Sequence, residues 1–577
     1  MTRPFLGTLL LGLAGCAFSR GAGPRPADLV LRGGAVFPRA PDPVRAQAVG
    51  IAGGRIVFVG SDEDARAWTG PRTRAIDLRG AMVLPGFHDA HAHPADGGLR
   101  LARCDLTGLA SVERVLEAVR AYAEGHPSEP WIEGEGWDLP LFPDANPHRS
   151  LLDAIVSGRP VYLVAADGHS AWANTRALAI AGITRETPDP PAGRIERDPA
   201  TGEPTGTLRE DAMALVSRRL PPTSREERLE GLRRGLAFAA RHGITSLLDA
   251  GADGETLEAY RSLEREGALP VRVVAAIPVR AAEGIAAVSR LVELRRRFRT
   301  RLLRPIGAKI HLDGVIESRT AALLEPYADR PGERGGARFE PAALDALVAP
   351  LAREGFQLHF HAIGDRAVRM ALDSIERVRL RPGSRGVRPH LAHLELVDPA
   401  DVARFARLGA VANFQPLWAY ADPYITELTN PVLGPERSSR LYPIGSLVRA
   451  GARVAFGSDW PVTSIDPLEG IQVAVTRRGP ADGAGPAWLP DERVDLPTAL
   501  AGYGASAAFA LHQERETGTI EPGKAADLVV LDRNLFELPA ERIHEARVLL
   551  TLFEGRETYR DPAFDRGLPS KGTRGPR

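Results

Sequence analysis

Two histidines two residues apart, His91 and His93, are residues whose type and spacing suit metal chemistry. They follow a short apolar segment that is typical of a β-strand. In an extended chain, residues i and i+2 point to the same face, so both imidazoles can reach one point. Neutral imidazole is a common ligand of zinc and similar ions. A chance pair on the surface is the alternative.

Further candidate ligands stand at the ends of other apolar segments. His359 and His361 end one segment, His393 ends another, and Asp459 follows a third. Enzymes built on barrels of parallel strands keep their chemistry at the carboxyl ends of the strands. Several imidazoles and one carboxylate at such ends suit zinc or a similar divalent ion. Each histidine alone has a structural interpretation, which does not explain why all of them share this position.

The elements that must position these groups alternate between apolar segments and amphipathic stretches. This alternation indicates an α/β fold with a parallel sheet and crossover helices, most simply a (β/α)8 TIM-like barrel. Nine segments compete for eight strand positions, and position four is open between 271–277 and 306–312. The candidates are 83–88, 161–165, 244–249, 271–277, 306–312, 356–361, 390–393, 409–414 and 453–457. The expected helices include 111–124, 224–242, 281–298, 342–354, 365–377 and 399–407.

Both ends of the chain carry short alternating β patterns punctuated by glycine. A similar pattern of short apolar segments occurs in residues 28–82 and in the later part of 496–560. This similarity predicts that the two ends form one composite β-sandwich. The barrel is expected to cover residues 83–495, and its last part is expected within 496–560. Residues 95–230 exceed the needs of one βα unit and predict an inserted subdomain. The basic tail at 561–577 is rich in Gly and Pro, and disorder is expected there.

Composition narrows the class of protein. The 577 residues contain 73 Lys+Arg and 73 Asp+Glu, so no net charge favours nucleic acid or an anionic membrane. The two cysteines, Cys16 and Cys104, exclude a disulfide framework and a thiolate zinc cluster. Residues 1–20 have the pattern of an export signal, and Leu13–Cys16 resembles a bacterial lipoprotein site in which Cys16 is lipidated. An ordinary cleaved signal, or merely an apolar start, is the alternative.

With these histidines and Asp459, the chain resembles the amidohydrolase superfamily. It is most similar to the branch that includes the N-substituted formamide deformylases and related exoenzymes of unassigned substrate. The resemblance covers roughly residues 28–560. It rests on the segments 85–93, 309–314, 319–321, 361–365, 457–461 and 518–532 together with His393. The resemblance implies that the metal ligands are His91, His93, His361, His393 and Asp459.

The resemblance implies that Lys309 is a further residue of the metal site. It stands in an apolar segment, and burial lowers the pKa of a lysine amine. Superfamily relatives with a lysine here carboxylate it and use the carbamate to bridge two metal ions. The alternatives are an ordinary lysine paired with Asp313, and a site that holds one metal ion. His169 is expected to polarise the substrate carbonyl or orient the leaving group, while His359 and Asp313 are expected to support the ligands.

The expected activity is hydrolysis of a carbon–nitrogen bond other than a peptide bond, in an amide or N-substituted formamide, by metal-activated water. Asp459 is expected to accept the proton of the water and return it to the leaving nitrogen. A deaminase, a cyclic-amide hydrolase or a non-catalytic binder of small ligands at the cell surface are the alternatives. The expected partners are a small amide substrate and a second copy of the chain. The expected location is the cell envelope, in the outer membrane through the lipid or in the periplasm.

Overall fold

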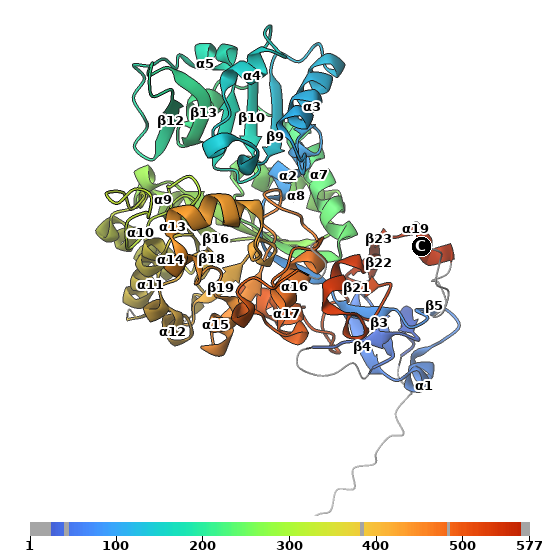
Figure 1. The fold of residues 1–577 in the computed structure, drawn as a ribbon. Helices are drawn as coiled ribbons and strands as arrows, with labels where there is room; N and C mark the ends of the chain where they lie inside the picture. Colours follow the sequence, from blue (N-terminus) through green and yellow to red (C-terminus); the bar gives the residue numbers. More distant parts are fainter. Residues whose placement is uncertain (1–24, 40–45, 381–385, 482–484, 567–577) are drawn as a thin grey trace, which may run out of the picture.

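The computed structural model describes residues 25–39, 46–380, 386–481 and 485–566 of the chain. The fold has three parts (Figure 1). A barrel of eight parallel strands forms the centre, a β-sandwich joins the two ends of the chain, and a subdomain is inserted after the first barrel strand. The predicted signal at 1–20, with Cys16, lies outside the described residues.

The barrel confirms the predicted α/β fold class. Neighbouring strands are parallel, in the order β20-β19-β18-β17-β16-β15-β14-β7. The strands are β7 (Phe87–Ala92), β14 (Ile244–Asp249), β15 (Arg272–Val279), β16 (Leu303–His311), β17 (Gln357–Ala362), β18 (His390–His393), β19 (Val411–Phe414) and β20 (Arg453–Phe456). The backbone N–H of Asp459, just after β20, donates to the carbonyl of His91 in β7 at 2.7 Å. The first and last strands therefore meet at the rim.

Helices cover the outside of the barrel because each carries an apolar stripe. In α11 (Asp365–Arg379), Val368, Leu372 and Ile375 repeat at helical spacing and are buried. The predicted helices of this region are present as α7 (Arg225–Arg241), α9 (Ala286–Phe298), α10 (Pro341–Arg353), α11 and α12 (Pro399–Leu408). Further helices are α8 (Gly254–Arg265), α15 (Ile444–Arg449) and α16 (Pro467–Thr476).

The structure resolves the competition among the nine strand candidates. The segment 161–165 is not a barrel strand, because it forms β10 (Val161–Ala165) in the sheet of the inserted subdomain. Both 271–277 and 306–312 lie in barrel strands, β15 and β16, so the fourth position belongs to β16. The segment 83–88 divides between β6 (Met82–Pro85) in the sandwich and β7 in the barrel. Apolar composition alone does not distinguish a strand of a barrel from a strand of a neighbouring sheet.

The sandwich pairs the two ends of the chain as predicted. One sheet contains β1 (Leu29–Arg32), β3 (Ala48–Ala52), β4 (Arg55–Gly60) and β5 (Arg74–Asp77). The other contains β2 (Ala35–Val36), β6, β21 (Leu528–Leu531), β22 (Val548–Phe553) and β23 (Arg556–Arg560). Val83 of β6 lies opposite Val530 of β21, in antiparallel register. Both valines are buried in a core that includes Leu31 and Leu550.

The inserted subdomain is a six-stranded sheet with its own apolar core. Its strands are β8 (Cys104–Asp105), β9 (Ile132–Trp137), β10, β11 (Ser170–Ala173), β12 (Gly193–Arg197) and β13 (Pro204–Glu210), and the predicted helix 111–124 is its α3 (Val112–Gly125). The chain enters through α2 (Pro94–Arg100) and leaves through α7. A Cβ atom at Gly98 would lie 1.8 Å from the carbonyl oxygen of Gly231, so these helices approach this closely because residue 98 is a glycine.

The end of the chain differs from the prediction of disorder at 561–577. Residues Pro562–Arg566 form the short helix α19, so the prediction is wrong there, and residues 567–577 lie outside the described part. In the part of the chain that the structure describes, no helix is long and apolar enough to cross a membrane.

Candidate metal centre

The site lies at the carboxyl ends of the barrel strands. His91 stands in β7 and His93 directly after it, His361 lies in β17, His393 ends β18 and Asp459 follows β20. The parallel register brings these ends to one rim, since Ala362 of β17 lies opposite His393 of β18. The sheet therefore brings together candidate ligands that are far apart in sequence.

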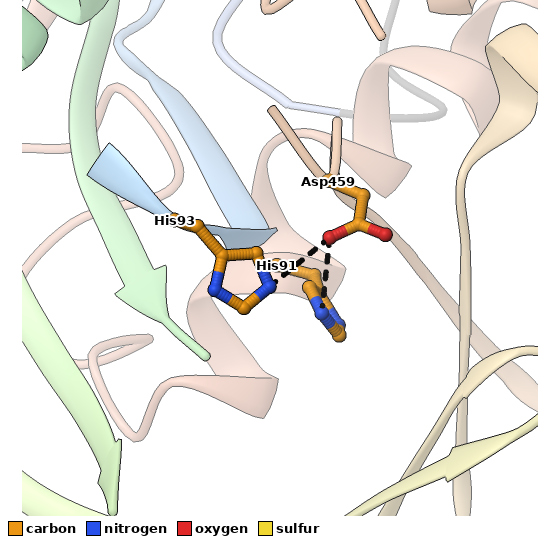
Figure 2. Close-up of side chains that lie close together, drawn as sticks. All are labelled: His91, His93 and Asp459. Atoms are coloured by element: carbon orange, nitrogen blue, oxygen red, sulfur yellow. Dashed lines mark ion pairs between the residues drawn. The ribbon is translucent and has the colours of Figure 1, made fainter. Parts of the chain in front are cut away.

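The centre of the site is formed by His91, His93 and Asp459 (Figure 2). Oδ1 of Asp459 lies 3.3 Å from Nε2 of His91 and 3.3 Å from Nε2 of His93. One ligand atom from each of the three residues lies within 4.8 Å of the other two. This spacing suits a single ion held by two imidazoles and a carboxylate.

His361 and His393 stand next to this group. Their ring centroids are 4.5 Å apart, and Nδ1 of His393 lies 3.8 Å from Oδ2 of Asp459. Nδ1 of His393 also lies 2.9 Å from Oε1 of Gln415, which can only accept, so this nitrogen carries the proton. Nε2 of His393 then offers a lone pair, and this buried atom has no hydrogen-bond partner among the described residues.

Lys309 completes the inner surface of the site. Its Nζ lies 3.0 Å from Nε2 of His91, and the side chain is buried. Burial lowers the pKa of this amine to about 8, against the opposing charges of Asp459 and Asp249. No ion pair joins Lys309 to Asp313 in the described residues, so the predicted alternative pairing is not formed. Lys309 therefore supplies a partly neutral amine directly beside a candidate metal ligand.

The protonation of most of the candidate histidine ligands suits metal binding. His93 is the exception, because burial would lower its pKa but its contact with Asp459 outweighs burial and raises it. Burial holds the pKa of His91 and His361 well below the ordinary value, and the charge of Lys309 adds to this effect. Burial likewise lowers the pKa of His393 to about 3. Burial alone would raise the pKa of Asp459, but His93, His393 and Lys309 outweigh it and hold that pKa below its ordinary value. Neutral imidazoles and an ionised carboxylate are the forms that bind a metal ion.

His359, one of the residues expected to support the ligands, contacts His91. Nε2 of His359 lies 2.9 Å from Nδ1 of His91, and Nδ1 of His359 lies 3.3 Å from Nδ1 of His390. These three histidines form a chain that orients His91 with Nε2 towards the site. Asp313 lies 3.7 Å from Nε2 of His361. Asp313 also accepts the backbone N–H groups of Ala322, Ile363 and Gly364, and so fixes the loops at this rim.

His169 reaches the site from the inserted subdomain. Its ring centroid lies 5.4 Å from that of His361. Nδ1 of His169 lies 3.0 Å from both carboxylate oxygens of Glu210, which also accepts from Thr320 at 2.8 Å and from Arg338 at 2.8 Å. Burial would lower the pKa of His169, but the charges of Glu210 and Asp167 prevail and raise it to about 9. The raised pKa favours the cationic form of His169 beside the candidate metal ligands.

Sequence reasoning missed Glu210, Arg338 and Gln415. Glu210 and Arg338 stand in segments without a recognisable motif, and only the fold brings them to His169. Gln415 directly follows β19, so its position at the end of a barrel strand is a signal that could have identified it.

Backbone conformation also marks the site. His393, Asp459 and Glu210 have φ angles of 79°, 56° and 51°, in the left-handed region that side chains other than glycine rarely adopt. Such conformations cost about 1–3 kcal/mol each and persist where the surrounding structure enforces them. Two of the three are candidate ligands and the third holds His169. The surrounding structure therefore holds these three residues in strained backbone conformations, which set the directions of their side chains.

These residues fit a divalent metal ion. The donor set combines imidazole nitrogens with an ionised carboxylate, which suits zinc. The unpartnered Nε2 of His393 is the clearest sign, because a buried imidazole nitrogen without a partner is costly. Together, the barrel and this donor set define a metal-dependent hydrolase.

The chain belongs to the amidohydrolase family, whose sequence pattern matches residues 74–559. It is 33% identical to "Protein LONG AFTER FAR-RED 3" of Arabidopsis thaliana, over 92% of each chain. It is 29% identical to the N-substituted formamide deformylase of Arthrobacter pascens, over 89% of this chain and 95% of that one. Among solved structures, an uncharacterized metal-dependent hydrolase from Pyrococcus furiosus is similar, with a TM-score of 0.68, 27% identity and coverage of 88% of this chain and 99% of that chain.

Proposed function

We propose that this metal-dependent hydrolase cleaves a carbon–nitrogen bond other than a peptide bond, in a small amide or N-substituted formamide. The observation that carries the proposal is the convergence of two imidazoles on Oδ1 of Asp459, with His393 alongside. The N-substituted formamide deformylase supports this choice of substrate class, because that relative matches nearly the whole chain. Zinc is the proposed metal.

His91, His93, His361, His393 and Asp459 would hold the metal. A divalent ion supplies Lewis acidity, which polarises a carbonyl and lowers the pKa of a water molecule to about 7. The carboxylate of Asp459 accepts a proton from the attacking water and delivers it to the leaving nitrogen. Protonated His169 donates a hydrogen bond to the substrate carbonyl or leaving group, while Glu210 holds its ring in place.

Carboxylation of Lys309 is part of the proposal. The neutral Nζ adds to the carbon of carbon dioxide, a new N–C bond forms and one proton leaves, so a carbamate with two oxygens results. The lowered pKa of the amine and its contact with His91 favour this reaction. The carbamate oxygens would provide ligands for a second ion.

Asp459→Asn tests the role of the carboxylate. The amide oxygen keeps a ligand atom, but it cannot take a proton, so we expect the metal content to remain and kcat to fall by about 10²–10⁴-fold. The assay is a panel of N-substituted formamides, linear amides, cyclic amides and aminopurines, with metal analysis of the same samples. Asp491→Asn, an exposed residue, is the matched control.

The panel also separates the alternatives. Turnover of cyclic amides or aminopurines alone would replace the proposal by a cyclic-amide hydrolase or a deaminase. Binding without turnover of any compound would favour a small-ligand binder. Full activity of Asp459→Asn would refute the assigned proton transfer.

We also propose export to the cell envelope through lipidation of Cys16. The support is the sequence pattern of residues 1–16 alone. Labelling with a radioactive fatty acid in a bacterial host should mark the wild-type chain and not Cys16→Ser. Equal labelling of both chains would refute the proposal.

A further inference from the structure

One turn of the chain supplies two contacts to the candidate ligand His393. It is the 3-10 turn η6 (Pro416–Trp418), which follows Gln415 at the end of barrel strand β19. The backbone N–H of Trp418 donates to the carbonyl of Gln415 at 3.0 Å. Residues three apart lie one above the other in such a turn, because it has three residues per turn. Gln415 and Trp418 can therefore present their side chains to one neighbour, and both contact His393.

The indole of Trp418 stacks on the imidazole of His393. The two rings are nearly parallel, with 4° between their planes and 5.4 Å between their centroids. Aromatic rings prefer offset parallel or edge-to-face arrangements at separations of about 4.5–7 Å. The imidazole also contacts the rings of His361 and His91, at 4.5 Å and 4.8 Å, each tilted by 59°. Rotation of the imidazole about its side-chain bonds would break the parallel contact, so the indole restricts this rotation.

Gln415 decides which edge of the imidazole faces the site. Its buried Oε1 lies 2.9 Å from Nδ1 of His393 and accepts the proton there. A half turn of the ring would put a carbon atom in the place of Nδ1 and lose this hydrogen bond. In this orientation Nε2 of His393 is buried without a hydrogen-bond partner in the described part of the chain. Such a nitrogen is costly and points to a ligand from outside the chain, here the proposed metal ion.

The indole is also anchored to a second part of the metal centre. Nε1 of Trp418 donates to Oγ1 of Thr463 at 3.1 Å. The hydroxyl of Thr463 donates in turn to the carbonyl of Ser458 at 3.1 Å, and Ser458 directly precedes Asp459. Trp418 thus connects the imidazole at the end of β18 with the loop after β20 that carries the candidate carboxylate ligand.

The backbone at His393 shows why its side chain needs support. His393 and Leu394 have φ angles of 79° and 54°, in the left-handed region that residues other than glycine rarely adopt. Conformations of this kind persist where surrounding contacts enforce them. The N–H of Leu394 donates to the carbonyl of Ala362 at 3.1 Å and holds the main chain. Trp418 and Gln415 hold the side chain.

We propose that Trp418 and Gln415 are positioning residues of the metal centre. They clamp the imidazole of His393 with Nε2 towards the metal ion, and Trp418 keeps this ligand aligned with Asp459. The proposal deepens the proposed function, since it rests on the metal centre proposed there, but it does not depend on which bond the enzyme cleaves. A ligand that is held in place before the ion arrives loses less freedom on binding, so the clamp raises metal affinity.

The first test measures metal affinity without turnover, by titration of metal-free protein with zinc in competition with a chromophoric chelator. Trp418→Leu removes the ring and its N–H, so we expect zinc affinity to fall by about 10–100-fold, as is usual when a group that orients a ligand is lost. Trp418→Phe keeps a flat ring on His393 and should recover most of this loss. Trp488→Leu is the matched control and should keep the wild-type affinity, because this half-buried tryptophan packs against Arg477 and Tyr442.

The second test distinguishes positioning from general stability. Cobalt(II) replaces zinc, and its visible absorption bands depend on the number and geometry of its ligands. We expect the spectrum of the Trp418→Leu complex to differ from that of the wild type, and the spectrum of Trp418→Phe to resemble it. Gln415→Leu removes the acceptor of Nδ1 and should lower zinc affinity by a similar factor, whereas Gln415→Glu keeps an acceptor and should not. Gln415→Leu replaces Trp418→Leu if that variant does not fold.

The outcomes separate this proposal from the proposed function. Wild-type zinc affinity and an unchanged cobalt spectrum in Trp418→Leu and Gln415→Leu would overturn the clamp. An equal loss of affinity in Trp488→Leu would overturn it as well, because the effect would then be one of stability. If no amide is hydrolysed but the differences in metal binding hold, the proposed function fails and the clamp stands. If amides are hydrolysed and both leucine variants bind zinc as the wild type does, the proposed function stands and the clamp is refuted.

Discussion

The contact between His169 and Glu210 yields a prediction about pH. Both oxygens of Glu210 lie 3.0 Å from Nδ1 of His169, and together with Asp167 they raise the pKa of this histidine from 6.5 to about 9. A rise of this size corresponds to about 3 kcal/mol in favour of the imidazolium. The proposed mechanism needs that imidazolium, so the wild-type enzyme should lose activity as the pH rises through about 9.

Glu210→Gln removes the larger of the two carboxylate contributions but keeps a similar shape. We expect the alkaline limb of kcat/KM against pH to move down by about two units, because burial then acts with less opposition. The measurement is a pH profile from 6 to 10 at saturating metal. Glu203→Gln, a more exposed glutamate of the same subdomain, should keep the wild-type profile.

The same shift has a consequence for stability. A histidine whose pKa is raised in the folded protein stabilises it fully below pH 6.5, and this contribution disappears as the pH rises through about 9. The unfolding free energy of the wild type should therefore decrease across this range more steeply than that of Glu210→Gln. An alkaline limb at the same pH in both proteins would refute the assignment of His169 as the acid.

Two further predictions concern buried histidines. His359→Ala removes the partner of Nδ1 of His91, so metal affinity measured by chelator competition should fall by about 10–100-fold. Burial lowers the pKa of His88 to about 3. Between pH 6.5 and 3, His88 is therefore protonated in the unfolded chain but neutral in the folded chain. The unfolding free energy of metal-free protein should therefore decrease as the pH is lowered from 6.5 to 3. His88→Asn should reduce the slope of this decrease by about 1.4 kcal/mol per pH unit.

Controls for these variants come from the surface. His126→Gln changes an exposed histidine and should leave the pH dependence of unfolding as in the wild type. An unchanged slope in His88→Asn would show that His88 is not a source of acid sensitivity. Unchanged metal affinity in His359→Ala would show that the chain from His91 through His359 to His390 does not orient the ligand.

The sequence was sufficient for the parts of the site that follow from local spacing. His91 and His93 are two residues apart, and His393 and Asp459 end apolar segments, so their meeting at one rim follows from the barrel. The sequence was insufficient where packing between distant segments decides. The contact of His359 with His91 depends on how side chains turn inside the barrel.

The fold shows the same division. The strand character of 161–165 was recognisable, but its place in a second sheet was not, because both sheets bury apolar strands.

Metal content is the most direct test of the central claim. Elemental analysis of protein without residues 1–20, purified with zinc and bicarbonate, should find two ions per chain and formamide hydrolysis that chelation abolishes. Lys309→Ala should lose metal, because the carbamate ligand cannot form. One ion that persists in Lys309→Ala would contradict the carbamate and leave a site with one metal. No bound metal after reconstitution, or hydrolysis that survives chelation, would contradict the account of a metal-dependent hydrolase.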